Sequence, residues 1–371
     1  MAARRETVVV GGGAMGSATA WHLARRGRQV TLLERYGARH AMGASHGRSR
    51  NFNVTYVEPT YQAMLREAAV LWRELEDESG ARLLDVVGVT NHGAGVAPDL
   101  ADVLGALGAR AEMLTAAQAQ ERWSGIRFDT RVLHCPDGGR LDAEESVAAL
   151  QSQTARHGGE VLLDTQVESI DVRADGRVEV MTPGEIFIAD TVVVTVGAWT
   201  EKLLGASLAL PRLVVTQEQP AHFAVADPAA VWPSYNHVPE PGHPRYDYWL
   251  SPTYGTLTPG EGVKAGWHGV GPVTDPDDRT FEPEPVQLAA LQRYAREWLP
   301  GVDADALTPI SCTYTSTSDT DFVLDRVGPI VVGAGFSGHG FKFVPTVGRI
   351  LADLVEGTTR AAVTFSLGRA R

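Results

Sequence analysis

Residues 7–27 read TVVVGGGAMGSATAWHLARRG, and this stretch decides the fold. A short apolar run ends in a G-x-G-x-x-G turn at Gly11, Gly13 and Gly16, and a helix-forming run of small residues follows. Because glycines have no Cβ, such a turn lets a pyrophosphate approach the backbone, and the N-terminus of the next helix attracts the phosphates. The stretch therefore predicts a dinucleotide site near the start of the chain.

The neighbouring residues complete a βαβ unit. We expect a buried strand over 7–10, a helix from Ala14 to about Arg26 that Gly27 ends, and a second strand over 29–33.

Glu34 stands at the end of the second expected strand. A carboxylate at this point of the motif accepts hydrogen bonds from ribose hydroxyls and repels the 2′-phosphate of NADP. The motif and the acid therefore favour FAD or NAD over NADP, and they do not separate FAD from NAD.

Length and composition limit the other possibilities. The 371 residues exceed the roughly 250–300 that one hydrophobic core serves, so we expect two lobes. A net charge of −12 argues against a general partner among nucleic acids or anionic membranes, because these bind surfaces rich in Lys and Arg. We expect a small molecule as the partner.

The two cysteines, Cys135 and Cys312, are too few for a disulfide framework or a cysteine-rich metal site, and we expect no metal. No apolar run reaches the ~20 residues that a membrane-spanning helix needs. The apolar run after Arg4 and Arg5 breaks at once into glycines, which is not the pattern of an export signal. We expect a cytoplasmic protein, and we favour a monomer over an oligomer.

Further segments extend the nucleotide-binding lobe. Apolar residues at helical spacing predict one helix, and a capping box at Asp142 and Glu145 predicts the start of another. The expected elements are helices over 61–79, 142–157 and 345–355 and strands around 161–163, 191–196 and 329–334.

Residues 212–300 differ in composition, being rich in Pro, Tyr, Trp and His, and they alternate in polarity at 246–250 and 262–268. We expect a mostly antiparallel sheet here. The predicted fold is a two-lobed α/β protein with a Rossmann-like domain built from residues 1–80, 141–211 and 310–371 and a discontinuous antiparallel-sheet substrate domain built from residues 81–140 and 212–309.

Taken alone, Cys312 is either a small buried core residue or a functional thiol in a hydroxyl-rich neighbourhood. Cys312 also lies within one of several motifs that together resemble a known family. The chain resembles the monomeric sarcosine oxidase and N-methyltryptophan oxidase family of flavoproteins, within the D-amino-acid oxidase superfamily. The resemblance runs nearly end to end through GASHGRSR (43–50), WRELEDESG (72–80), TQVESI (165–170), TVVVTVGAW (191–199), GVKAGWH (262–268), SCTYTSTSDTDF (311–322) and GAGFSGHGFKF (333–343).

The resemblance implies that FAD is the cofactor and that Cys312 carries it through a thioether. It also implies that His46 lies beside the flavin, that Arg50 packs against the far face of its ring, and that the 338–341 loop stabilises its reduced form. The implied cofactor contacts are Gly11, Gly13, Ala14, Met15, Gly16, Glu34, Arg35, Ser45, His46, Arg50, Val167, Gly197, Trp199, Cys312, Gly338, His339, Gly340, Phe341 and Lys342.

The resemblance also identifies residues for the chemistry. Lys264 is similar to the lysine that assists reaction with O₂, because a fixed cation stabilises the negative charge that forms there. His268 falls four residues later on the same face of the expected strand, and Lys342 resembles the lysine that binds the substrate carboxylate. The residues implied in catalysis are Lys264, His46, Arg50, His268, Tyr314 and Lys342.

One position departs from the family pattern. Asn53 stands where the family has an arginine that helps Lys342 to hold the substrate carboxylate, and replacing a cation by an amide weakens such a contact. Arg48 is a candidate for compensation. The family's tyrosine before the lysine-bearing strand has several candidates in the aromatic segment 246–249.

We therefore expect an FAD-dependent amine oxidase that converts a secondary or tertiary amine, or a cyclic imino acid, to an imine and passes the electrons to O₂ to give H₂O₂. Sarcosine is expected to be a poor substrate, and a larger amine of secondary metabolism is favoured. The alternatives are a flavin dehydrogenase that uses an electron carrier, an NAD-dependent dehydrogenase, and a non-catalytic flavin-binding subunit.

Overall fold

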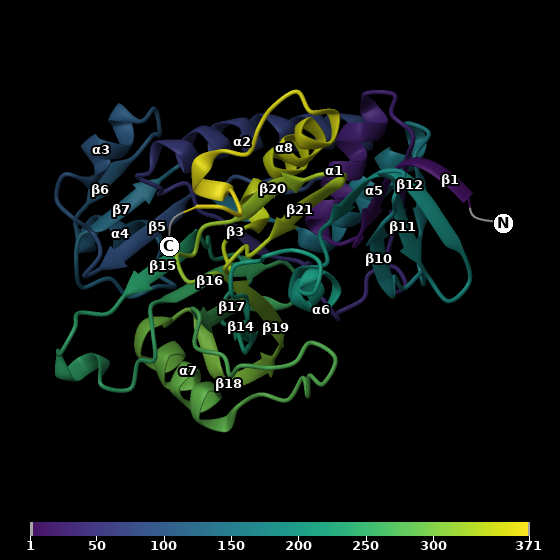
Figure 1. Ribbon diagram of the computed structural model, residues 1–371. Coiled ribbons are helices and arrows are strands. Elements are labelled where there is room, and N and C mark those ends of the chain that lie inside the picture. The colour runs from purple at the N-terminus through teal and green to yellow at the C-terminus, as the bar shows by residue number, and fades with distance from the viewer. Residues whose placement is uncertain (1–2, 370–371) are drawn as a thin grey trace.

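The computed structural model describes residues 3–369, which form two lobes around two large sheets (Figure 1). The mixed α/β fold that the sequence predicts is confirmed. Within the described residues, no helix is both long and apolar enough to cross a membrane.

The first sheet has a parallel centre that runs in the order β9-β2-β1-β12-β21. Antiparallel strands extend it beyond β12 and β21. Its strands are β1 (Ala3–Val10), β2 (Val30–Leu33), β9 (Glu160–Leu162), β10 (Ser169–Val172), β11 (Val178–Met181), β12 (Ile186–Val194), β20 (Val323–Val327) and β21 (Ile330–Ala334).

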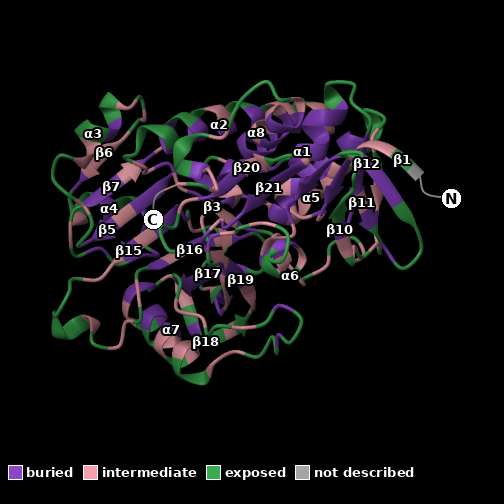
Figure 2. Ribbon diagram, in the orientation of Figure 1, coloured by how far each residue is buried: buried purple, intermediate pink, exposed green. Residues whose placement is uncertain are grey.

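Helices cover one face of the first sheet. Their apolar sides and the sheet enclose a core that contains Trp21, Trp72 and Leu351, each fully buried. Figure 2 shows buried residues along the strands of this sheet and on the helices that cover it. The helices are α1 (Ala14–Arg25), α2 (Pro59–Ser79), α5 (Ala143–Arg156) and α8 (Val344–Glu356), in agreement with the predicted positions.

The second sheet is antiparallel except where β15 runs parallel to β5. In spatial order its strands are β18 (Val302–Pro309), β14 (Ala221–Val225), β17 (Gly262–Trp267), β16 (Thr253–Thr258), β15 (Ser234–Val238), β5 (Val89–Gly93), β7 (Val132–Cys135) and β6 (Glu112–Leu114). The predicted antiparallel lobe is thus confirmed in kind, and segments on both sides of α5 contribute to it.

Helix α7 (Pro285–Trp298) packs on one face of the second sheet, where Trp298 and Tyr294 meet Trp267 in a second core. The remaining elements are short. They are α3 (Leu100–Ala106), α4 (Ala116–Arg122), α6 (Thr200–Leu204), the antiparallel pair β13 (Val214–Glu218) and β19 (Cys312–Ser316), the small sheet β3 (Arg50–Phe52), β8 (Gly139–Leu141) and β4 (Leu84–Asp85), and the 3-10 turns Gly197–Trp199, Pro244–Tyr246, Phe341–Phe343 and Val363–Phe365.

The prediction of a strand at 246–250 is wrong. This segment follows the 3-10 turn Pro244–Tyr246 and has no ladder partner among the described strands. The alternation of its aromatic residues has another cause, because Tyr246 and Trp249 pack their rings against each other and against Trp298.

Candidate active site

A cavity of ≈ 610 Å³ lies at the carboxyl ends of β1, β2 and β12. Val10, Leu33 and Thr195, at or just after these ends, line it. The strand that begins the sheet, β1, has β2 on one side and β12 on the other, so the chain order reverses here. Parallel sheets bind ligands at such a point, outside the carboxyl ends of the strands.

The glycine turn lies against this cavity in the predicted form. Gly11 has a φ of +100°, and a Cβ at Gly16 would lie 2.0 Å from the carbonyl oxygen of Gly11. A side chain at Gly13 would meet only the hydroxyl of Ser45, at 3.3 Å. Two glycines are therefore required by the turn itself, and the third leaves the approach to helix α1 open, as a bound pyrophosphate needs.

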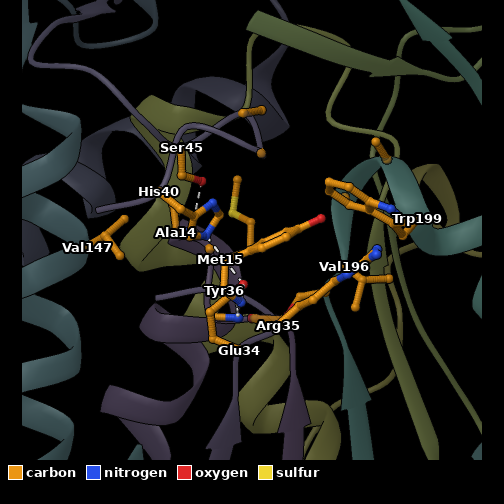
Figure 3. A pocket seen from close by; sticks show the side chains of 18 of the residues that line it. Ala14, Met15, Glu34, Arg35, Tyr36, His40, Ser45, Val147, Val196 and Trp199 are labelled. Atoms are coloured by element: carbon orange, nitrogen blue, oxygen red, sulfur yellow. Dashed lines mark hydrogen bonds and ion pairs between the residues drawn. The ribbon is translucent and has the colours of Figure 1, made fainter. Parts of the chain in front are cut away.

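Glu34 is buried and holds the turn from the side of β2. Its carboxylate accepts hydrogen bonds from the backbone N–H groups of Gly12 (2.7 Å) and Tyr36 (2.9 Å). The close-up in Figure 3 shows Glu34 and Arg35 near the turn, and Met15 and Tyr36 between Val147 and Trp199 in this view. A carboxylate in this place suits a ribose, as the motif predicts.

A loop of the second lobe closes the mouth of the cavity next to Arg35. Asp277 accepts hydrogen bonds from Nε1 of Trp199 and from the guanidinium of Arg35, both at 2.8 Å, and Lys202 contacts it at 2.6 Å. These contacts hold the pKa of Asp277 at about 2, against the opposing effect of its partial burial. The loop is therefore fixed by ion pairs to the lobe that carries the glycine turn.

Cys312 lines the other end of the cavity, at the start of β19. The hydroxyl of Tyr314, two residues on, lies 3.3 Å from Nδ1 of His268, and the ring of Tyr314 packs so tightly on Gly338 that a Cβ there would lie 2.2 Å from it. The thiol, Tyr314 and the 336–341 loop are thereby brought together, as the resemblance implies.

Arg50 and His46 form the wall opposite. The guanidinium of Arg50 donates to the carbonyl oxygens of Ser49 (2.7 Å), Ala44 (2.9 Å) and His46 (2.5 Å), which fixes the loop before β3. Burial, with a further contribution from Arg50, lowers the pKa of His46 to about 4. The imidazole is therefore neutral near pH 7, and Nδ1, 2.8 Å from the carbonyl oxygen of Gly43, is the protonated nitrogen.

Lys264 is buried in the middle of β17. Its neighbours Val263 and Ala265 belong to the core beneath α7, so the lysine points to the opposite face of the sheet, toward the first lobe. There its ammonium donates to the carbonyl oxygen of Ser49. Burial is the main cause that lowers the pKa of Lys264 to about 7, and the nearby Arg50 adds to it.

Lys342 is buried on the far side of the site. Its ammonium donates to the hydroxyl of Tyr56 at 3.1 Å and to the carbonyl oxygen of His339 at 2.6 Å, and Nε1 of Trp72 donates to its backbone carbonyl at 3.1 Å. Burial lowers the pKa of Lys342 to about 7. The lysine is rigidly placed and lacks an anionic partner among these contacts.

Lysine is rare in this chain. Of its 33 lysines and arginines, only Lys202, Lys264 and Lys342 are lysines. One lines the mouth of the cavity and the other two are the buried cations just described. The pKa of an ammonium falls readily on burial, whereas a guanidinium stays protonated. The two buried positions therefore carry the type of cation whose protonation state burial can change.

The predicted residues do not all line one cavity. Most cofactor contacts do, but Gly16, His339, Lys342, Lys264 and His268 are absent from its wall. His268 follows the end of β17 and is exposed overall, although partial burial of its ring and the charge of Lys342 lower its pKa. These residues lie behind or beside the wall.

Asn53 and Arg48 have other contacts. The side-chain oxygen of Asn53 accepts hydrogen bonds from the N–H (3.0 Å) and hydroxyl (2.5 Å) of Thr55. Arg48 is exposed and lies 3.7 Å from the carboxylate of Asp142. The contact with Asp142 does not place Arg48 where it could replace the missing cation of the site.

Three residues of the site escaped the sequence analysis. Tyr254 on β16 is the aromatic neighbour of the lysine-bearing strand, paired with Gly266 and close to Tyr314, in place of the candidates at 246–249. The other two are Tyr56 and Arg279. Strand pairing would have identified Tyr254, but no local pattern marks Arg279, which arrives from a loop.

Comparisons with known proteins agree with this geometry. The model of the FAD dependent oxidoreductase family, DAO, matches residues 6–354. The chain is 31% identical to the monomeric sarcosine oxidase of Bacillus sp. (strain NS-129), over 100% of this chain and 98% of the relative. It is 27% identical to the N-methyl-L-tryptophan oxidase of Yersinia pestis (strain Pestoides F), over 99% of each.

Among solved structures, the open form of NikD, an unusual amino acid oxidase essential for nikkomycin biosynthesis, superposes with a TM-score of 0.87 at 28% identity, covering 100% of this chain and 98% of NikD. The resemblance drawn from the sequence motifs is therefore confirmed. The chain belongs to the family of FAD dependent oxidoreductases.

Proposed function

We propose that the protein is an FAD-dependent amine oxidase that oxidises the C–N bond of a secondary or tertiary amine, or of a cyclic imino acid, to an imine. The observation that carries this proposal is the charge at the end of the cavity near Cys312. Arg50 lines this end, Lys264 donates to the carbonyl oxygen of Ser49 as Arg50 does, and Arg279 donates to the hydroxyl of Ser311 beside Cys312. Lys342 lies behind the wall, next to His339. None of these four cations forms an ion pair with a carboxylate of the described chain.

A group of buried cations without anions is costly unless something negative binds among them. Bound FAD would supply a hydride acceptor here and would return the electrons to O₂ as H₂O₂. The cations suit each negative charge that this chemistry brings: on the reduced ring, on O₂ as it takes an electron, and on a substrate carboxylate. The chain itself thus provides electrostatic stabilisation.

The residues that would hold FAD follow the cavity from end to end. The glycine turn would receive the pyrophosphate, Glu34 the ribose, and Val167 and Trp199 the adenosine side, with the flavin ring toward Cys312. We propose a thioether between Cys312 and the flavin. Denaturing the purified protein in acid tests it: yellow colour that stays with the precipitate supports the link, and colour left in the supernatant refutes it.

Lys342 is proposed to bind a carboxylate or another electron-rich group of the substrate. It would do so alone, because Asn53 replaces the second cation of the family and is held in its own turn by Thr55. A small amino acid that depends on two cations would bind weakly. We therefore propose a substrate larger than sarcosine, bound mainly by contacts away from the carboxylate, and the similarity to NikD is consistent with a role in secondary metabolism.

No protein base is needed if the amine binds in its unprotonated form. His46 is kept neutral by burial, and the pKa of His268 is also lowered by burial, so neither adds a charge that would repel the substrate nitrogen. The chain's part in the step is to orient the amine, exclude water and keep the surrounding charge positive.

A carrier-dependent dehydrogenase of the same fold is the second candidate. A buried ammonium at Lys264 favours O₂, because a fixed cation in a dry site stabilises superoxide. Measuring peroxide under air decides between them: about one H₂O₂ for each imine formed supports the oxidase, whereas turnover only with an added electron acceptor supports the dehydrogenase. A colourless protein with bound NAD would refute both.

We retain the predictions of a monomer and of a cytoplasmic location. Both cysteines are free in the described chain, which suits a reducing compartment. The proposed domains follow the boundaries given above, with β13 and β19 pairing where they meet.

A further inference from the structure

Arg279 is a buried arginine that contacts the residue before Cys312. Its side chain is 8% exposed, comes from the loop that carries Asp277, and reaches past the mouth of the cavity into the first lobe. One terminal nitrogen donates to the carbonyl oxygen of Met42 at 2.7 Å and the other to the hydroxyl of Ser311 at 2.9 Å.

These two contacts hold the segments that carry Cys312 and His46, both of which line the cavity. Ser311 precedes Cys312, and Met42 precedes the loop that carries His46. Arg279 thus ties three segments together at the point where the thiol enters the cavity. No other arginine or lysine of the described chain donates a hydrogen bond to residue 311 or 42.

The charge of Arg279 is not matched. Its Nε is buried and has no hydrogen-bond partner within residues 3–369, and no carboxylate there forms an ion pair with it. Burying a guanidinium in this way is costly, and the structure tolerates the cost only if a negative group comes to lie beside it. Burial lowers the pKa of Arg279, and Cys312 and Tyr36 are the groups of the chain that oppose this shift.

We propose that Arg279 is the positioning residue for flavin attachment: it fixes Ser311 and the 42–46 loop so that the sulfur of Cys312 faces the cavity. This inference rests on the covalent link proposed above.

Attachment would be a two-electron oxidation that forms a C–S bond. The bond from Sγ of Cys312 to the methyl carbon at position 8 of the flavin replaces the S–H bond and one C–H bond. The two electrons released pass to the flavin ring and from it to O₂, and the two protons leave with them in H₂O₂. The chain contributes the sulfur, its orientation and the neighbouring positive charge.

The first experiment needs no flavin. Apo-protein is treated with iodoacetamide at pH 7.5, and alkylation of Cys312 is followed by mass spectrometry. Arg279→Gln is expected to slow alkylation by about fivefold or more, because Ser311 and the 42–46 loop lose the donor that holds them. Arg279→Lys, which can still donate a hydrogen bond, is expected to slow it by less than about half of that factor. Arg293→Gln, at an exposed position on α7, is the matched control and should leave the rate unchanged.

Cys135 serves as an internal control for correct folding in the same sample. It is fully buried, and burial raises the pKa of its thiol to about 12, so it should stay unmodified in every folded variant. If Arg279→Gln exposes Cys135, Ser311→Ala replaces it as the test, because it removes the hydroxyl that receives the hydrogen bond and keeps the arginine. Ser311→Ala is then expected to slow alkylation about twofold or more.

The second experiment measures attachment. Apo-protein is mixed with FAD under air, and the share of flavin that survives acid precipitation is followed over time. Arg279→Gln should lengthen the half-time of attachment about fivefold or more, and Arg279→Lys should restore much of the rate. Equal alkylation and equal attachment in wild type and a folded Arg279→Gln would overturn the proposal. A wild type that never retains flavin in acid would refute the thioether instead, and the alkylation result would still decide what Arg279 does to the thiol.

Discussion

The ammonium of Lys342 donates a hydrogen bond to the hydroxyl of Tyr56 over 3.1 Å, in a buried position without a carboxylate contact in the described chain. A second buried lysine, Lys264, is bound to a backbone carbonyl in the same manner. Both sites bury an ammonium next to neutral dipoles, which offset only part of its lost hydration.

Two of the three lysines should titrate well below the third. With ¹³Cε-labelled lysine, NMR of the apo-protein should show two resonances that titrate near pH 7, from Lys264 and Lys342, and one above the usual lysine range, because Asp275 and Asp277 raise the pKa of Lys202. Each lysine's conversion to methionine assigns its signal. Three lysines titrating together near pH 10 would contradict the expectation.

The same shifts fix the sign of a stability change. A lysine whose folded pKa lies below its unfolded pKa binds fewer protons when folded, so the free energy of unfolding rises with pH between about 7 and 10.4. The slope is at most about 1.4 kcal/mol per pH unit for each lysine. Urea unfolding at several pH values should show a smaller slope in Lys264→Met than in wild type, and an equal slope would refute the shift at Lys264.

Lys264→Met should separate the two halves of the reaction. Reduction of the protein by its amine substrate without air is expected to proceed at a similar rate, because the lysine is bonded to Ser49 and is not needed to bind substrate. Reoxidation in air should slow at least tenfold, since superoxide loses its stabilising cation. Stopped-flow absorbance measures both steps, with Arg293→Met as the control, and unchanged reoxidation removes Lys264 from the O₂ step.

Asn53→Arg should shift substrate preference toward compounds with a carboxylate. The change restores the second cation of the family, so kcat/KM for N-methyl amino acids should rise about tenfold relative to the matching amides. Because Asn53 also holds a turn through Thr55, Thr55→Val is the control for loss of that turn alone. A ratio that rises equally in the control would place the carboxylate contact elsewhere.

Asp277→Asn should weaken the first, non-covalent binding of FAD about three- to tenfold, because it breaks the contacts to Arg35, Lys202 and Trp199. Flavin fluorescence on mixing measures this in a Cys312→Ser background, where no thioether forms. Asp278→Asn removes the same charge from the next, exposed residue and should change nothing. Rising salt should weaken binding to the parent protein and affect Asp277→Asn less.

Gly16→Ala should abolish FAD binding, since its Cβ would lie 2.0 Å from the carbonyl oxygen of Gly11 and 2.5 Å from the hydroxyl of Thr195. Gly105→Ala, in helix α3 with open space around it, should instead stabilise the protein by about 0.5–1 kcal/mol. Thermal unfolding and FAD titration compare the two. Normal FAD binding by Gly16→Ala would show that the turn can open to admit the methyl group.

The sequence was most reliable where the structural cause is local. The strand, glycine turn and helix at residues 7–26 require only neighbouring residues, and the cores of α2, α5 and α8 follow from helical spacing. The segment 246–250 shows the limit. Its polar and aromatic residues alternate as in a strand, yet the rings of Tyr246 and Trp249 pack on Trp298 of helix α7. Here tertiary contacts override the local preference for a strand.

The sequence alone determined the nucleotide-binding fold and the family, and it singled out Lys264, Lys342 and Cys312 as candidate site residues. Only the tertiary structure decided that both lysines are buried without anions, that Tyr254 is the aromatic neighbour of Lys264's strand, and that Arg279 reaches the residue beside Cys312. The physical reason is that desolvation and charge depend on every group packed around a site. Those groups come from strands and loops far apart in the chain, which no local pattern relates to one another.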